Sequence, residues 1–129
     1  IDKNLKPVNS IFDNESIPKI GIKDYLIRIM KYCKINKSTI VIALVYIDRL
    51  PSDFFISMFN IHKVILTAIL VASKINEDKI HTNFYFAKVG GINLFEMNLL
   101  EIDFLKLLEY NLLVDSAAFI QYVKHIKTF

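Results

Sequence analysis

Two apolar stretches of this chain carry charged side chains where the core face of a helix would carry none. The first stretch, residues 43–50, includes Asp48 and Arg49, and the second, residues 67–75, holds Lys74. An unpaired charge is costly to bury, so a charge fixed to an apolar helix is expected to have a dedicated partner. The chemistry that these residues offer is ion pairing, either within the chain or with another protein.

Glu101 is a further charge of this kind. On a helical wheel of about 100° per residue, it lies inside an apolar stripe that includes Met97 and Leu105. Three interpretations follow from the residue types. The carboxylate can pair within the chain, for instance with Lys74; the stripe can be a docking surface for another protein; or Glu101 can lie at a rim that faces water.

Asp48 is predicted to form an intramolecular salt bridge that holds two helices in place. Its candidate partners are Lys19, Arg28 and Arg49, and Arg28 is the residue that we assign to the pair.

The segment 61–75 is apolar around most of its circumference, which is typical of a helix inside a bundle. Its narrow polar stripe consists of Lys63, Thr67 and Lys74 and is predicted to face outward through a gap. Lys74 can also be an ordinary lysine at the C-terminal end of a helix, where the helix dipole favours a cation.

The elements that position these charges are predicted to be helices throughout. Apolar residues at helical spacing predict helices over 22–33, 39–50, 61–75, 83–89, 94–110 and 116–127. The predicted N-caps are Ser38 or Thr39, Asn60, Thr82, Asn93, and Asp115 or Ser116.

Three regions are predicted along the chain. Residues 1–17 are predicted to be an N-terminal arm with one helical turn near 8–12, residues 18–114 the main domain, and residues 115–129 an additional C-terminal helix. The chain begins with Ile and has no apolar signal-peptide core, so we expect a fragment of a longer protein.

The composition fits one helical domain. The 129 residues include only three Gly and three Pro, and 53% are hydrophobic, which favours long helices over a fold with many turns. No uncharged apolar run is long enough to span a membrane. The net charge of +3 is spread along the chain and includes only two arginines, so neither a nucleic acid nor a membrane is an expected partner.

Patterns that indicate catalysis or metal binding are missing from the sequence. A single cysteine, Cys33, excludes an internal disulfide and fits a reducing compartment. His62, His81 and His125 are too scattered to predict a zinc site. The pair Gly90-Gly91 is too short for a nucleotide-binding loop and follows no strand. We therefore expect no metal, no cofactor and no enzymatic activity.

Several segments together resemble a known family. Tyr46-Ile47-Asp48-Arg49, Ala72-Ser73-Lys74-Ile75-Asn76-Glu77-Asp78 and Leu100-Glu101-Ile102-Asp103-Phe104-Leu105 are similar to conserved segments of the cyclin box. Segments 20–29, 83–92 and 96–101 are most similar to the phosphate-pathway cyclins, the P-type or U-type group. The resemblance covers residues 18–114.

The resemblance implies a cyclin box of five helices around a buried central helix, in a regulatory subunit that binds and activates a cyclin-dependent protein kinase. It implies that Lys74 and Glu101 contact the regulatory helix of the kinase, and that Asp48 is the family's buried aspartate. The complete set of expected kinase contacts is Lys74, Glu101, Ile75, Ile102, Leu105 and Lys63. We expect a chain that is monomeric without the kinase and that acts in the nucleus, the cytoplasm or both.

The sequence departs from the family in three respects. The second helical repeat of two-box cyclins is missing, the first helix lacks the arginine that often pairs with the aspartate, and Ile75 stands where many relatives have Phe. Two alternative functions remain open at this stage. One is a helical adaptor that binds without activating, and the other is a cyclin-fold module of the transcription-factor type. The biological process, phosphate signalling or the cell cycle, stays open too.

Overall fold

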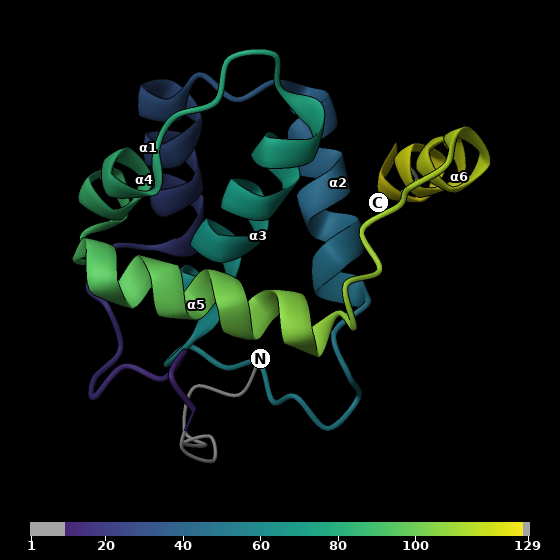
Figure 1. Cartoon of the computed structure of the whole chain (residues 1–129). Helices are drawn as coiled ribbons and strands as arrows, with labels where there is room; N and C mark the ends of the chain where they lie inside the picture. Colours follow the sequence, from purple (N-terminus) through teal and green to yellow (C-terminus); the bar gives the residue numbers. More distant parts are fainter. Residues whose placement is uncertain (1–9, 128–129) are drawn as a thin grey trace.

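A computed structural model of the chain describes residues 10–127, which form six helices and no strand. Figure 1 shows α3 in the middle, with α2 on one side of it, α1 and α4 on the other side, and α5 crossing in front. The all-α prediction is confirmed. The helices are α1 (Ile22–Cys33), α2 (Lys37–Asp48), α3 (Ile61–Asn76), α4 (Asn83–Gly90), α5 (Leu94–Leu107) and α6 (Ser116–Lys127).

The central helix α3 is buried on nearly every side, as its sequence predicts. All its residues from Leu66 to Ser73 are buried, and it contacts α1, α2, α4 and α5. Thr67 is therefore not part of an outward-facing stripe, which corrects the sequence-based prediction. Its hydroxyl donates to the backbone oxygen of Lys63 at 2.7 Å, one turn earlier, and this bond satisfies a polar group that has no access to water.

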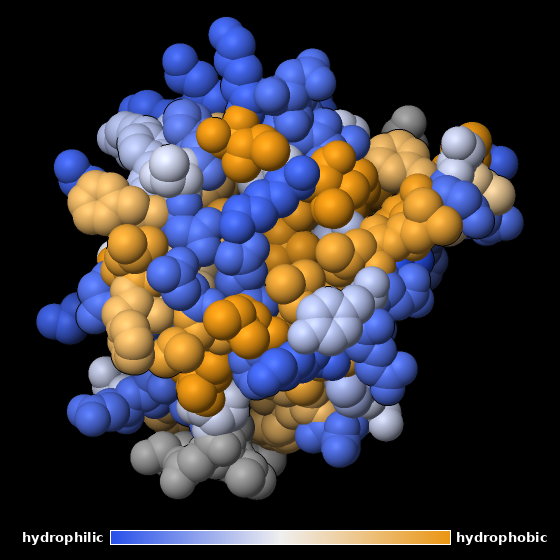
Figure 2. Space-filling view, viewed as in Figure 1, coloured by the Kyte–Doolittle hydropathy of each residue, from blue (hydrophilic) through white to orange (hydrophobic). Residues whose placement is uncertain are grey.

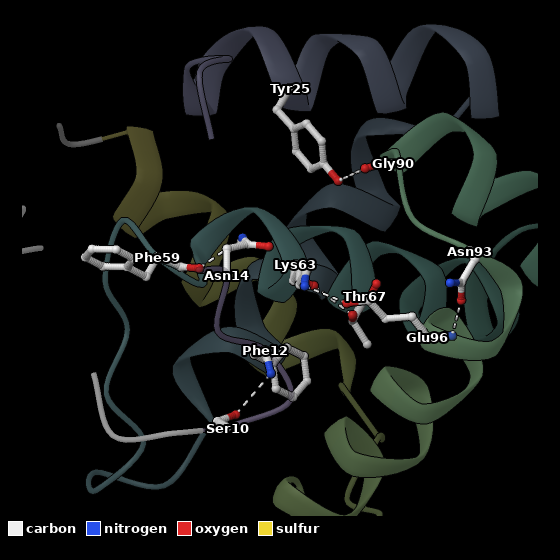
Figure 3. A network of polar contacts seen from close by, with 10 residues as sticks. All are labelled: Ser10, Phe12, Asn14, Tyr25, Phe59, Lys63, Thr67, Gly90, Asn93 and Glu96. Carbon is white, nitrogen blue, oxygen red and sulfur yellow. Dashed lines mark hydrogen bonds and ion pairs between the residues drawn. The ribbon is translucent and has the colours of Figure 1, made fainter. Parts of the chain in front are cut away.

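Close packing joins α1 to the end of α4. The hydroxyl of Tyr25 donates to the carbonyl oxygen of Gly90 at 2.8 Å, as Figure 3 shows. A Cβ atom at Gly90 would lie 2.3 Å from the side chain of Leu66, so glycine is what lets α4 end against α3. Gly91 follows with a φ of 80° and terminates α4 in the left-handed conformation.

Three of the predicted helix starts are confirmed by side-chain caps. Thr82, Asn93 and Asp115 accept hydrogen bonds from the backbone amides three residues later. Asn60 occupies the predicted N-cap position of α3, but its side chain does not cap the helix. Its amide group instead bonds the amide of Ser57 and the carbonyl of Phe55 in the preceding loop.

Two helices have ends that differ from the predicted ones by two residues or more. Helix α2 begins at Lys37 rather than at 39 and ends at Asp48 rather than at 50. Helix α5 ends at Leu107 rather than at 110, because Glu109 and Tyr110 adopt positive φ values of 52° and 58° and turn the chain away.

The N-terminal segment packs onto the helices from residue 10 onward. Phe12 is fully buried, with its ring 5.7 Å from that of Phe54 in an edge-on arrangement. Asn14 bonds the carbonyl oxygen of Phe59 through both its backbone and its side-chain nitrogen. Of the predicted turn at 8–12, residues 8 and 9 lie outside the described residues, and a turn is present at 11–12.

Candidate functional site

Lys74 and Glu101 meet at the surface where the C-terminal end of α3 faces the middle of α5. The Nζ atom of Lys74 lies 2.6 Å from Oε2 of Glu101. The Lys74 side chain is 37% exposed and the Glu101 side chain 15%. Of the three interpretations of Glu101, the intramolecular pair is thus realised. The pair keeps an open side, because more than a third of the lysine still faces solvent.

Asn83, at the start of α4, holds the second carboxylate oxygen of Glu101. Its Nδ2 atom donates to Oε1 of Glu101 and to Oδ1 of Asn98, each at 2.8 Å. Three helices therefore fix one carboxylate: α3 through Lys74, α4 through Asn83 and α5 itself. The sequence does not reveal this role of Asn83, because an asparagine at a helix start usually indicates capping and its distant partner leaves no local signal.

Exposed apolar side chains flank the ion pair. Ile75 and Ile102, each the next residue after a member of the pair, are 58% and 50% exposed. Leu105 lies one turn after Glu101, is half-buried and packs against the core. Figure 2 shows apolar surface, in orange, running across the face that carries α5, interrupted by hydrophilic side chains in blue. Exposed apolar side chains beside polar groups are typical of a protein-binding surface.

The end of α3 is anchored by the residue that follows it. Glu77 accepts hydrogen bonds from the backbone amide and side-chain nitrogen of Asn36, at 3.1 and 2.9 Å, and from the hydroxyl of Thr39. Asn76 donates to the hydroxyl of Thr39 at 2.9 Å. We call this set of contacts the Glu77 clamp. It accounts for the start of α2 at Lys37, and it holds in place the end of α3 that carries Lys74.

Lys63 belongs to a different cluster. It lies about three turns from Lys74 along α3, its side chain is 13% exposed, and it forms an ion pair with Glu96 at 2.5 Å. Figure 3 shows this pair beside Asn93, whose side chain caps α5 at the amide of Glu96. The structure therefore does not bring Lys63 together with the other predicted contacts.

The predicted salt bridge between Asp48 and Arg28 does not form. Asp48 is exposed at the last position of α2, and its Oδ2 atom accepts a hydrogen bond of 2.5 Å from the hydroxyl of Tyr122 in α6. Arg49 donates to the carbonyl oxygen of Asn111 instead. Sequence spacing could not reveal Tyr122 as the partner, because the contact depends on how the C-terminal helix folds back. The hydrogen bond adds to burial in raising the pKa of Tyr122 above its usual value.

The described part of the chain contains no group of three His, Cys, Asp or Glu side chains arranged to hold a metal ion. Within residues 10–127, no helix combines the length and the apolar character that a membrane crossing requires.

Comparison with known proteins agrees with this architecture. The family model described as Cyclin matches residues 2–112, so the chain belongs to the cyclin family. The buried central helix, the surrounding helices and the exposed end of α3 are thus those of a cyclin box.

Named relatives fall in the U-type and P-type groups, as the sequence segments predict. The chain is 42% identical to Cyclin-U2-1 of Arabidopsis thaliana over 120 residues, which cover 91% of this chain and 54% of that protein. It is 40% identical to Cyclin-P4-1 of Oryza sativa subsp. japonica, over 88% of this chain and 55% of that protein. It is 39% identical to PHO85 cyclin-like protein psl1 of Schizosaccharomyces pombe, over 86% and 47% respectively. The chain spans about half the length of these relatives.

Proposed function

We propose that this cyclin domain is the regulatory subunit of a cyclin-dependent protein kinase, which it binds and activates, and that it is not itself an enzyme. The observation that carries the proposal is the Lys74–Glu101 pair, held in place yet partly open to solvent, with exposed Ile75 and Ile102 beside it. Membership of the family and the similarity to a PHO85 cyclin-like protein support it.

The physical role of the pair is to present charges in a fixed geometry. Because Asn83 and Lys74 already satisfy Glu101 within the chain, the carboxylate needs little reorganisation when a partner covers it. The exposed isoleucines supply apolar area around it, and Leu105 backs them from the core. We propose that these five residues, Lys74, Glu101, Ile75, Ile102 and Leu105, form the kinase contact; Lys63, paired with Glu96, lies outside this group.

The mechanism is a population shift. The domain binds the kinase conformation whose regulatory helix is turned inward, which completes the kinase's own Lys–Glu ion pair and orders its activation loop. The cyclin domain supplies differential affinity and no catalytic group. It acts wherever its kinase is found, in the nucleus, the cytoplasm or both, and is monomeric before binding.

The test uses the kinase that affinity capture from the source cell identifies. Binding is measured by titration for the wild-type chain, Lys74→Ala, Glu101→Ala and the double variant. If both charges are desolvated in the complex, each single variant should lose about 2–5 kcal/mol of binding. The double variant should lose less than the sum, because the two side chains contact each other.

The matched control is Lys88→Ala combined with Asp53→Ala, which also removes one charge of each sign from exposed positions. It should bind like wild type. Normal binding by the Lys74/Glu101 double variant would disprove the contact. A parallel assay of kinase activity separates activation from adaptor function, since a chain that binds tightly without raising activity is an adaptor.

A further inference from the structure

Two asparagine side chains join α4 to α5 beside the ion pair. The Nδ2 atom of Asn83, at the start of α4, lies 2.8 Å from Oε1 of Glu101 and 2.8 Å from Oδ1 of Asn98. Asn98 is one turn before Glu101 on α5 and is exposed, whereas Asn83 is half-buried. The proposed kinase contact does not include Asn98.

The charge of Glu101 determines which way both amide groups point. An ionised carboxylate only accepts hydrogen bonds, so the atom of Asn83 that faces it is the nitrogen. Both hydrogens of this nitrogen are then used, one for Glu101 and one for Asn98. The atom of Asn98 that accepts the second hydrogen is the oxygen, since an amide nitrogen only donates. The direction of the Asn98 amide is therefore set by Glu101 through Asn83.

The nitrogen of Asn98 remains available as a donor. Among the described residues, the side chain of Asn98 forms a single hydrogen bond, which its oxygen accepts. Residues three and four positions apart are neighbours on a helix surface, so Asn98 lies beside Glu101 and Ile102. Both of these residues belong to the proposed kinase contact, and Ile102 is exposed. An amide of fixed direction, with two unpaired hydrogens, thus lies on the same surface.

Building on the proposed kinase contact, we propose that Asn98 is a further member of it, which donates a hydrogen bond to an oxygen of the kinase, and that Asn83 is the positioning residue that sets its direction. A side chain that is held in place before binding loses little conformational freedom in the complex. The fixed donor also gives specificity, because a partner that presents a donor at this point would leave two donors facing each other.

Asn98→Asp tests the donor while keeping the internal contact. An aspartate here still accepts the hydrogen bond from Asn83, but its other oxygen has no hydrogen for the kinase. Kinase affinity, measured by titration, should fall at least about tenfold, because two acceptors then face each other. Asn98→Ala adds no charge and should weaken binding about fivefold, the effect of one neutral hydrogen bond. Gln121→Glu, which also turns an exposed amide into a carboxylate, is the matched control on α6 and should bind like wild type.

The direction of the amides is tested by NMR on the full chain without the kinase. The side-chain amide hydrogens of Asn83, which are both bonded, should exchange with water more slowly than those of Asn98. In Asn83→Asp, which replaces the donor by an acceptor, the amide of Asn98 should turn over and its hydrogens should exchange more slowly than in wild type. A merely structural role of Asn83 does not predict this slowing.

Three results would overturn the proposal. The first is faster exchange at Asn83 than at Asn98 in the wild-type chain, the second is unchanged exchange at Asn98 in Asn83→Asp, and the third is binding by Asn98→Asp as tight as that of Gln121→Glu. If Glu101→Ala weakens binding while both Asn98 variants bind normally, the kinase contact stands and Asn98 alone is excluded from it. Normal binding by Glu101→Ala would remove the kinase contact and the role of Asn98 together.

Discussion

The hydroxyl of Tyr122 donates a hydrogen bond of 2.5 Å to the carboxylate of Asp48 and so joins α6 to the end of α2. The contact is important because α6 packs against α2 alone among the described helices, and Figure 1 shows it standing apart from the rest. A hydrogen bond to a charged acceptor stabilises more than a neutral one. This pair therefore controls how firmly the C-terminal helix stays docked.

Tyr122→Phe should loosen α6 while leaving the core intact. The variant loses one hydrogen bond to a charged group at a surface position, worth about 1 kcal/mol. Amide hydrogens of α6 should then exchange about fivefold faster, with little change in α3. Tyr32→Phe, which alters an exposed ring, is the control and should exchange like wild type. Unchanged exchange in α6 of Tyr122→Phe would contradict the docking role.

Glu77→Ala should destabilise the whole fold by about 1–3 kcal/mol, because the Glu77 clamp loses its only carboxylate and the buried hydroxyl of Thr39 loses its acceptor. Unfolding in urea measures the change. Asp78→Ala, which removes the same charge from the adjacent exposed position, should change stability by no more than about 0.5 kcal/mol. Equal effects of the two substitutions would show that charge, rather than the clamp, matters here.

Gly90→Ala should cost about 1–3 kcal/mol, because the new methyl group would approach Leu66 to 2.3 Å in a packed interior. Gly21→Ala is its counterpart, since a Cβ there meets no atom within 4 Å and the backbone φ is −68°. Gly21 is the N-cap of α1, where Ala is less favourable than Gly, and this loss offsets the gain through the unfolded state. The substitution should therefore change stability by less than about 1 kcal/mol. Thermal denaturation of both variants measures this difference in stability, and similar melting temperatures would refute the packing argument.

Cys33 should be unreactive in the folded chain. Burial raises the pKa of its thiol to about 11, so the thiolate that attacks iodoacetamide is scarce at mildly alkaline pH. Native chain should be alkylated far more slowly than chain unfolded in urea. Alkylation at the same rate in both states would show that the thiol is accessible and ionised.

The raised pKa of the Cys33 thiol makes the folded state less stable as the pH rises. In the interval between the ordinary thiol pKa of about 8.5 and the folded value, the unfolded chain binds fewer protons than the folded chain. The free energy of unfolding therefore falls with increasing pH across this interval. In Cys33→Ala the free energy of unfolding should fall less steeply with pH. Part of the fall that remains comes from Tyr25, whose pKa is also raised by burial.

The sequence predicts best where the signal is local. The period of α3 reveals a helix buried all round, and Thr82 and Asn93 reveal helix starts, because a cap lies within three residues of the amide it bonds. The end of α5 is not predicted correctly, because the two residues that adopt the left-handed conformation there are Glu109 and Tyr110. Glycine is the residue that usually indicates such a turn.

Long-range contacts are predicted only where a charge is conspicuous. Lys74 and Glu101 stand out as charges on apolar helices, and they pair across 27 positions. The contacts of Asn83 and Tyr122 are not predicted, because a polar residue on a surface of mixed character gives no sequence signal that identifies its distant partner. Asp48 is a case where the prediction is wrong, because the expected buried salt bridge is replaced by an exposed carboxylate that accepts a hydrogen bond from Tyr122.

The Glu77 clamp also bears on the order in which the chain folds. Asn36 and Glu77 are 41 positions apart, so the clamp closes α2 and α3 into an antiparallel hairpin of modest loop length. Such a hairpin, with α3 burying most of its surface, is the natural nucleus on which α1, α4 and α5 condense. Glu77→Ala should then slow folding more than it speeds unfolding, whereas a Tyr122→Phe effect should appear in the unfolding rate, because α6 joins last.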